Sequence, residues 1–385
     1  MAAFTGSLRT NEIFGAIYNM IISQQVFSNP IAGGFKSLVD RARVDGSMYG
    51  DQKLYYSVDS LETLPYSPDT ADQLNVLAVH RNKEISCQAI QMTVARQIPV
   101  TIDNYFSKRA FSTESVFADF NGVMLQWLRE TKKVYDQTLY NSYIGTAGSV
   151  VGQQMQSVDI SSVASPSGPQ EIEAAQRIVA ELIAEKIADL LVALQDPSRD
   201  FNDYQYLRSY DPSDIQVIWN SEWVNKLKKV DMPTIFHKDG LIDKFDEKNV
   251  LPARYFGSVN SSAGTTPSAA SKVRSLVETW YNAGAEVDVG SVGIDSIPST
   301  AVHVFPGDAL PTATSYAANK TYTENGNIIC KITAVDSVPY MSGFEVATEF
   351  VNSRNLSENH YLTFAHNELE YLKEKPMITV VATSN

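Results

Sequence analysis

The sequence predicts an α+β fold in which one long helix separates an extended β-hairpin from a mixed helix-and-strand domain. Residues 111–146 repeat apolar side chains at steps of three and four, as one long amphipathic helix does. Residues 47–105 alternate apolar and polar side chains, which is typical of strands. Residues 171–300 combine a second amphipathic helix with short apolar strands, and residues 324–385 return to strands.

The composition is that of a soluble globular chain with room for more than one domain. It has 385 residues, of which 44% are apolar and 19% charged. The net charge of −13, with no run of Lys or Arg, argues against nucleic-acid binding through the whole surface. Only two cysteines, Cys87 and Cys330, are present, which excludes a disulfide framework and indicates a reducing compartment. We find no secretory signal and no apolar run that would span a membrane.

The first 46 residues are expected to form an N-terminal arm. One short amphipathic helix is predicted before Pro30, and Leu38 and Val39 predict a second before Asp45-Gly46. The apolar residues of the first helix are Ile13, Phe14, Ile17, Tyr18, Ile21 and Ile22. Neither helix can bury its apolar face alone, so each is expected to pack on another part of the fold or on another subunit.

Residues 47–105 predict a long β-hairpin. Its alternation has one phase slip at Ala89-Ile90, which predicts a β-bulge. Cys87 shares a predicted strand face with Ile85, which favours a small apolar core residue over a reactive thiol. Because a two-stranded hairpin is marginally stable in water, we expect this one to reach across a neighbouring subunit.

The long helix falls within residues 106–146. Ser112 or Thr113 is expected to cap its start, and Gly145 is expected to close it. At about 1.5 Å per residue such a helix spans roughly 40 Å, which is more than twice the length of an ordinary helix of about three turns and suits a structural axis.

The next region predicts a separate α+β domain. Pro169 opens a helix that ends before Asp196-Pro197, and a buried strand follows at Ile215–Ile218. Asn220 or Ser221 is expected to cap a short helix. Later elements are predicted as a helix at 273–281 and strands at 287–294, 302–305, 328–335, 344–351, 361–364 and 377–381.

The sequence carries no catalytic motif. It has no Gly-rich phosphate loop, nucleophile elbow, paired CxxC or HExxH, so we expect no enzyme activity, no cofactor and no metal site. His366, Glu368 and Glu370 alternate on a predicted strand and would share one face, which a metal site allows. A solvated face is the more common outcome of such spacing. The other histidines are scattered, at His80, His237, His303 and His360.

Two further groups of residues are candidate sites. Asp196, Asp200 and Asp203 lie in a loop where they could bind a cation, but they lack the EF-hand positions and its glycine, which favours a solvated turn. Trp219 and Trp223 flank a helix cap and are expected to pack in the core.

The order of arm, hairpin, long helix, α+β domain and returning strands resembles the major capsid proteins of tailed bacteriophages. That fold is shared with herpesvirus shells and encapsulin compartments. In the family's terms, the parts are an N-arm at 1–46, an E-loop at 47–105, a P-domain spine helix at 106–146, an A-domain with connecting segments at 147–323, and returning strands at 324–385 that complete the P-domain sheet. The segment ELEYLKEKPMITV, residues 368–380, resembles the family's closing hairpin.

The resemblance implies a structural role. Copies would form hexamers and pentamers of an icosahedral shell around packaged double-stranded DNA, touching the DNA only weakly and without sequence preference. Scaffolding and portal proteins would be partners, no membrane would be involved, and the virion shell would assemble in the host cytoplasm. An encapsulin-type compartment or a phage tail or baseplate protein is the alternative. If the shell matures, the hairpin would move at its base, near Gly46–Gly50 and Thr101–Ser107.

Overall fold

The computed structural model describes residues 38–46, 50–61, 63, 85–103, 114–161, 163, 168–228, 249–260, 279–282, 285–287, 298, 300–304, 321–354 and 357–383. Several expectations therefore lie outside the described residues. They concern the first arm helix, the hairpin tip, the cap at Ser112 or Thr113, residues 104–107 of the proposed hairpin base, and the strand at 288–294.

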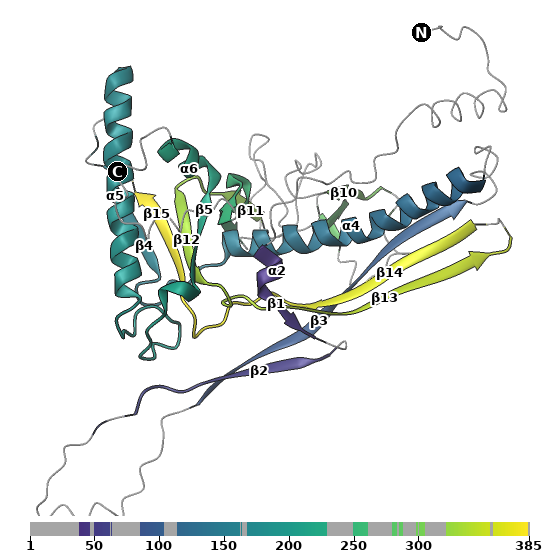
Figure 1. Ribbon diagram of the computed structural model, residues 1–385, viewed down its shortest axis with the longest axis horizontal. Helices are drawn as coiled ribbons and strands as arrows, with labels where there is room; N and C mark the ends of the chain where they lie inside the picture. The colour runs from purple at the N-terminus through teal and green to yellow at the C-terminus, as the bar shows by residue number, and fades with distance from the viewer. Residues whose placement is uncertain are drawn as a thin grey trace, which may run out of the picture.

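Two five-stranded sheets organise the described chain (Figure 1). The long sheet has, in spatial order, β1 (Arg43–Asp45), β13 (Tyr340–Asn352), β14 (Ser357–Asn367), β3 (Ser86–Asp103) and β2 (Gln52–Ser57). The second sheet has β4 (Met155–Asp159), β15 (Met377–Thr383), β12 (Ile328–Ala334), β5 (Ile215–Asn220) and β6 (Val250–Leu251). The C-terminal strands thus divide between the two sheets.

Strand β3 belongs to two pairings. It pairs with β14 from Met92 to Asp103 and with β2 from Ser86 to Gln91, both antiparallel. The β3–β14 register skips Thr93, which marks a bulge there, whereas the β2–β3 register is continuous through Ala89 and Ile90. The bulge predicted at Ala89-Ile90 is therefore wrong. Up to Ala89 the apolar side chains lie on the exposed face of the strand, whereas Ile90 and Met92 are buried on its opposite face. The phase slip therefore reflects a change of surroundings along a regular strand.

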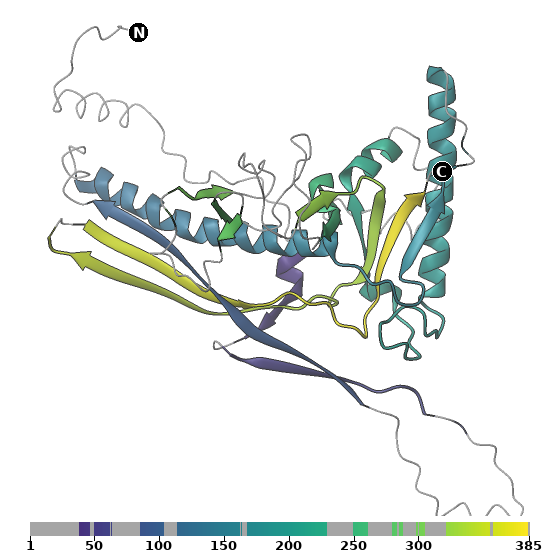
Figure 2. The same ribbon diagram turned by 180° about the vertical axis from the view of Figure 1, so that it is seen from behind.

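Helix α4 (Glu114–Thr146) confirms the predicted long helix. It runs lengthwise along the long sheet, and its C-terminal end reaches the second sheet (Figures 1 and 2). The helix ends at Thr146, one residue after Gly145, and Gly145 does not take the left-handed conformation of the glycine cap that was expected there. A Cβ on Gly145 would stand 1.9 Å from the carbonyl oxygen of Tyr255. The glycine is therefore needed for close packing against the short 3-10 helix η4 (Ala253–Tyr255) rather than for a left-handed cap.

One core cluster joins the C-terminal half of α4 to its surroundings. Tyr140 and Ile144 of α4 pack with Leu38 and Val39 of α2 (Leu38–Ala42), which confirms the short helix predicted at Leu38. Ile218 of the second sheet belongs to the same cluster. The long helix and the second sheet are therefore held by one shared apolar core.

Lys331 is buried on β12 in this joint. It is 1% exposed, and its ammonium group donates to the carbonyl oxygen of Ala147, directly after the last residue of α4. Helix α4 has no basic residue in its last turn. Lys331 therefore supplies, from the sheet, a hydrogen-bond donor to the carbonyl end of the helix. Burial lowers the pKa of Lys331 to about 7.

The opposite face of the second sheet is covered by α5 (Pro169–Ala193), which begins at the predicted proline. Ile183 and Ile187 of α5 are fully buried in this core. Trp219 and Trp223 are also buried, at 1% and 6% exposure, which confirms their predicted place. Asn220 accepts a hydrogen bond from the Glu222 backbone, as expected for the residue that precedes α6 (Ser221–Lys228).

The remaining elements are short. Thr279–Asn282 forms strand β8, so the helix predicted at 273–281 is wrong at its described end. β8 pairs with β9 (Ala285–Val287) and β10 (Val302–Val304), and β7 (Gly257–Asn260) pairs with β11 (Thr321–Glu324). The 3-10 helix η2 (Pro212–Asp214) directly precedes β5.

Gly145→Ala should destabilise the unassembled subunit. The new methyl group would collide with backbone rather than with a movable side chain, so we expect the free energy of unfolding to fall by about 2–3 kcal/mol. Gly326→Ala is the control, because its Cβ would come no closer than 3.8 Å to the Glu222 carboxylate. Chemical denaturation measures both variants. Equal stabilities would contradict the close packing inferred at Gly145.

The pH dependence of stability should depend on Lys331. Between about pH 7 and pH 10 the unfolded chain keeps the Lys331 proton while the folded chain releases it, so stability rises with pH across this window. Lys331→Met should remove a rise on the order of 3–5 kcal/mol. Denaturation of the unassembled subunit at several pH values measures this, with exposed Lys373→Met as a control that keeps the wild-type slope. An unchanged slope in Lys331→Met would refute the assignment.

Candidate assembly interface

The ribbon formed by β2 and the first half of β3 exposes an apolar outer face. Leu54 stands opposite Ala89, and Tyr56 stands opposite Cys87, so these four side chains share one face with Ile85. Tyr56 is 65% exposed, Ile85 60% and Leu54 48%, and both Cys87 and Ala89 are exposed. Cys87 is thus not the core residue predicted, because its strand face has no described part of this chain over it. We call these five residues the outer face.

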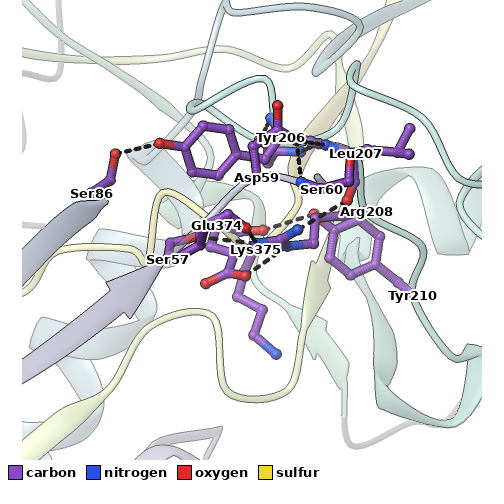
Figure 3. A network of polar contacts seen from close by, with 12 residues as sticks. Ser57, Asp59, Ser60, Ser86, Tyr206, Leu207, Arg208, Tyr210, Glu374 and Lys375 are labelled. Atoms are coloured by element: carbon purple, nitrogen blue, oxygen red, sulfur yellow. Dashed lines mark hydrogen bonds and ion pairs between the residues drawn. The ribbon is translucent and has the colours of Figure 1, made fainter. Parts of the chain in front are cut away.

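The inner face of the same ribbon is polar and is held on the body. The Ser86 hydroxyl lies 2.6 Å from the Tyr206 hydroxyl (Figure 3). The Gln88 side-chain amide donates to the carbonyl oxygen of Tyr371 at 2.9 Å and accepts from the backbone of Lys373 at 3.0 Å. The ribbon is therefore fixed by directional hydrogen bonds on one face and left bare on the other.

Arg208 clamps the end of β2 to the C-terminal segment (Figure 3). Its guanidinium contacts the Glu374 carboxylate at 2.7 Å and donates to the Val58 carbonyl oxygen at 2.6 Å. The Tyr210 hydroxyl donates to the Glu374 carbonyl oxygen at 2.7 Å. Charge-assisted hydrogen bonds are strong and directional, so they fix the orientation of the end of β2 on the body.

Asp59 completes the clamp just beyond β2. Its carboxylate accepts from the backbone of Leu207 at 3.0 Å, from Arg199 at 2.8 Å and from the backbone of Ser60 at 2.8 Å. These hydrogen bonds, led by the one from Leu207, hold the pKa of Asp59 far below its ordinary value. No signal in the sequence marks Arg208, Tyr206 or Asp59, because polar loop residues carry no periodic pattern and the partners of Arg208 and Asp59 are about 150 positions away.

The structure brings together neither of the two candidate metal-binding groups, the three aspartates of the loop after α5 and the group around His366. Asp196 and Asp200 are exposed, whereas Asp203 accepts hydrogen bonds from Ser149, Gln154 and Tyr371 and joins three segments of the body. Across the described ranges, no three His, Cys, Asp or Glu side chains come together in a way that could hold a metal ion.

His366 is separated from Glu368 and Glu370. Strand β14 ends at Asn367, and His366 is 3% exposed while both glutamates face solvent, so the expected shared face is wrong. The His366 ring lies 3.0 Å from the Tyr135 hydroxyl and 2.8 Å from the Asn367 carbonyl oxygen. Burial lowers the pKa of His366. The residue is part of the packing between α4 and the long sheet.

The base of the ribbon is also not where the sequence placed it. Thr101 lies near the far end of β3, paired with Asn359. The ribbon instead departs at Met92, whose backbone exchanges hydrogen bonds with Gly50 and Asp51 next to the bulge at Thr93. Gly50, with a φ of +93°, takes the left-handed conformation that glycine favours there. Of the two parts of the predicted base, Gly50 lies where the ribbon departs, whereas Thr101 does not.

Comparisons with known proteins agree with a structural role. A family model described as Phi29-like phage major capsid protein matches residues 7–378. The search among curated proteins finds no match. Among the described helices, none has both the length and the apolar character that a membrane crossing requires.

Two solved structures share this fold. A chain in the capsid structure of Staphylococcus phage Andhra has a TM-score of 0.57 and 13% sequence identity, covering 94% of this chain and 87% of that chain. A chain in the structure of the head fiber and inner core protein gp22 of native bacteriophage P68 has a TM-score of 0.57 and 11% identity, covering 93% and 87%. Similarity at these identities shows the mixed helix-and-sheet fold of phage capsid structures, as the sequence predicted.

Arg208→Ala should loosen the ribbon without unfolding the body. Losing the contacts to Glu374 and Val58 should raise amide hydrogen exchange at Ser57–Ser60 at least tenfold, because this segment depends on the clamp. Exchange in β12 should stay at the wild-type rate. Arg354→Ala, in the exposed turn between β13 and β14, is the control. Wild-type protection at Ser57–Ser60 in Arg208→Ala would show that the clamp does not hold the ribbon.

Proposed function

The chain belongs to the family of Phi29-like phage major capsid proteins, whose model matches it over residues 7–378, and from this premise we propose how it builds a shell. Copies form hexamers and pentamers that close into an icosahedral shell enclosing packaged double-stranded DNA. The observation that carries the proposal is the ribbon with a clamped polar inner face and a bare apolar outer face. Such a face suits a contact made between subunits.

The ribbon is proposed as the family's E-loop, within residues 47–105, and α4 as the spine helix, within 106–146. The N-arm is residues 1–46, the A-domain residues 147–323, and the returning strands residues 324–385. The position of α4 along the long sheet supports the spine role. Since β12 and β15 lie in the second sheet, the returning strands serve both units in this proposal.

Repeated weak contacts are enough for such a shell. Each ribbon offers a small apolar face, and each subunit in a closed shell makes the contact once and receives it once. The net charge of −13 suits a wall that does not adhere to the DNA packed inside it. Scaffolding and portal proteins are the proposed assembly partners, the host cytoplasm is the proposed place of assembly, and the role involves no catalysis.

Particle formation tests the proposal. The chain is expressed alone and with neighbouring viral genes, and light scattering and negative-stain electron microscopy measure the products. Closed shells, or sheets of hexamers and pentamers, are expected. A nucleic-acid and protein assay of the particles then distinguishes packaged DNA from the enzyme cargo of an encapsulin-type compartment. A stable monomer whose ribbon resists protease would overturn the proposal, because the ribbon would then have found its surface within its own subunit.

Tyr56→Arg should prevent assembly while leaving the subunit folded. Tyr56 is mostly exposed, so a charged replacement costs the isolated subunit little, but a charge at the centre of an apolar contact would be buried without a partner. We expect an unchanged thermal midpoint and at least a tenfold loss of particles by light scattering. Tyr56→Phe, which keeps the apolar ring, should assemble normally. Wild-type particle yield from Tyr56→Arg would exclude the outer face from the contact.

A further inference from the structure

A groove of about 820 Å³ lies between α4 and the strands β13 and β14. Its floor is apolar, with the buried Leu128 of α4 and Leu362 of β14, and the exposed Ala347 of β13 also lines it. Its rim is polar and carries both signs of charge, including Arg129 on the helix and Glu349 on the sheet. An apolar floor with a mixed polar rim suits a peptide segment better than a small anion or cation.

The groove continues a face of α4 that another segment of this chain already covers. Gly122, Gln126, Arg129 and Lys133 line the groove at steps of four and three, and the same steps lead on to Asp136, Tyr140 and Ile144. Residues spaced in this way lie on one side of a helix. Along the second part of that side, α2 packs against Tyr140 and Ile144, and Arg43 pairs with Asp136 at 3.3 Å.

The described chain begins at Leu38 of α2, which packs on α4 beyond the Lys133 end of the groove. Leu38 packs near Tyr140, and the nearest groove residue on α4 is Lys133, seven positions away. That separation is about 10 Å along a helix. The 15 residues from 23 to 37 can span up to roughly 50 Å when extended, so the connection is easily made.

Gly122 gives a second reason to expect an occupant. It lies inside α4 and lines the groove, and a Cβ built on it would meet no atom within 4 Å. Glycine is unfavourable within a helix, and no described part of the chain lies close enough to Gly122 to require a residue without a side chain. A second backbone lying close against α4 would use the space that glycine leaves.

We propose that the apolar stripe of the N-terminal arm, residues 13–22, docks as a helix in this groove of its own chain. The stripe consists of Ile13, Phe14, Ile17, Tyr18, Ile21 and Ile22, which share one face at helical spacing. Its length is about 14 Å, and the groove follows α4 for about 17 Å from Gly122 to Lys133. The short connection to α2 favours the chain's own groove, because it keeps the local concentration of the arm high.

Disulfide trapping in dilute, unassembled subunits tests this docking. Ile17→Cys, at the middle of the stripe, is combined with Arg129→Cys, at the middle of the groove, in a Cys87→Ser background. Cys330 stays, because it is fully buried. Mild oxidation should give an intrachain disulfide, measured by mass spectrometry of the monomer band on a non-reducing gel.

The matched control pairs Ile17→Cys with Thr131→Cys. Thr131 is exposed two residues further along α4, which turns it about 200° away from the groove. The Arg129 pair should form at least tenfold faster than the Thr131 pair, and Gly122→Trp, which fills the groove, should remove that difference. Circular dichroism checks that each variant keeps its helices, and Lys133→Cys replaces Arg129→Cys if that variant fails to fold.

Three results would overturn the proposal. Equal rates for the two pairs would mean that the arm does not select the groove, and absence of any disulfide would mean that it does not reach α4. Disulfides found only in dimers would mean that the arm occupies the groove of another copy. Mixing chains that carry Ile17→Cys alone with chains that carry Arg129→Cys alone identifies this last case.

Discussion

The described architecture depends on one strand with two sets of partners. Strand β3 pairs with β14 in the long sheet from Met92 to Asp103 and forms a two-stranded ribbon with β2 from Ser86 to Gln91. In the sheet, β3 is supported by β14, which itself pairs with β13, and by contact with α4, whereas a two-stranded ribbon needs a surface beneath it. The bulge at Thr93 and the glycine turn at Gly50 lie where one condition changes to the other. The ribbon can therefore project from the body without breaking the sheet.

The body gives the ribbon only half of the surface that it needs. Its inner face is tied through Ser86 and Gln88, and the end of β2 is fixed by Arg208 and Asp59. Behind this attachment, the shared core at Tyr140 and Ile144, together with the buried ammonium of Lys331, joins α4 to the second sheet. A rigid body with a projecting ribbon whose outer face is apolar is a suitable unit for a shell, because contacts can form between subunits without refolding within them.

Local periodicity predicted much of this fold. The α4 and α5 helices and the strands β5, β12 and β15 were found because long amphipathic or fully apolar runs leave a strong signal in the sequence. Features that depend on distant partners were not found. The sequence shows that Cys87 and Ile85 are apolar, but whether the chain's own core covers their strand face depends on the tertiary structure. The sequence also predicts Gly145 as a glycine cap, because only the position of Tyr255 explains why a glycine is needed there.

The reactivity of Cys87 is the most direct test of this account, whose central claim is that assembly buries the outer face of the ribbon. Maleimide labelling, followed by peptide mass spectrometry, compares free subunits with assembled particles, and buried Cys330 serves as the internal reference. The account predicts fast labelling of Cys87 in the free subunit and at least tenfold protection in the particle. Equal labelling of Cys87 in both states would show that the outer face stays exposed to solvent, and it would contradict the account.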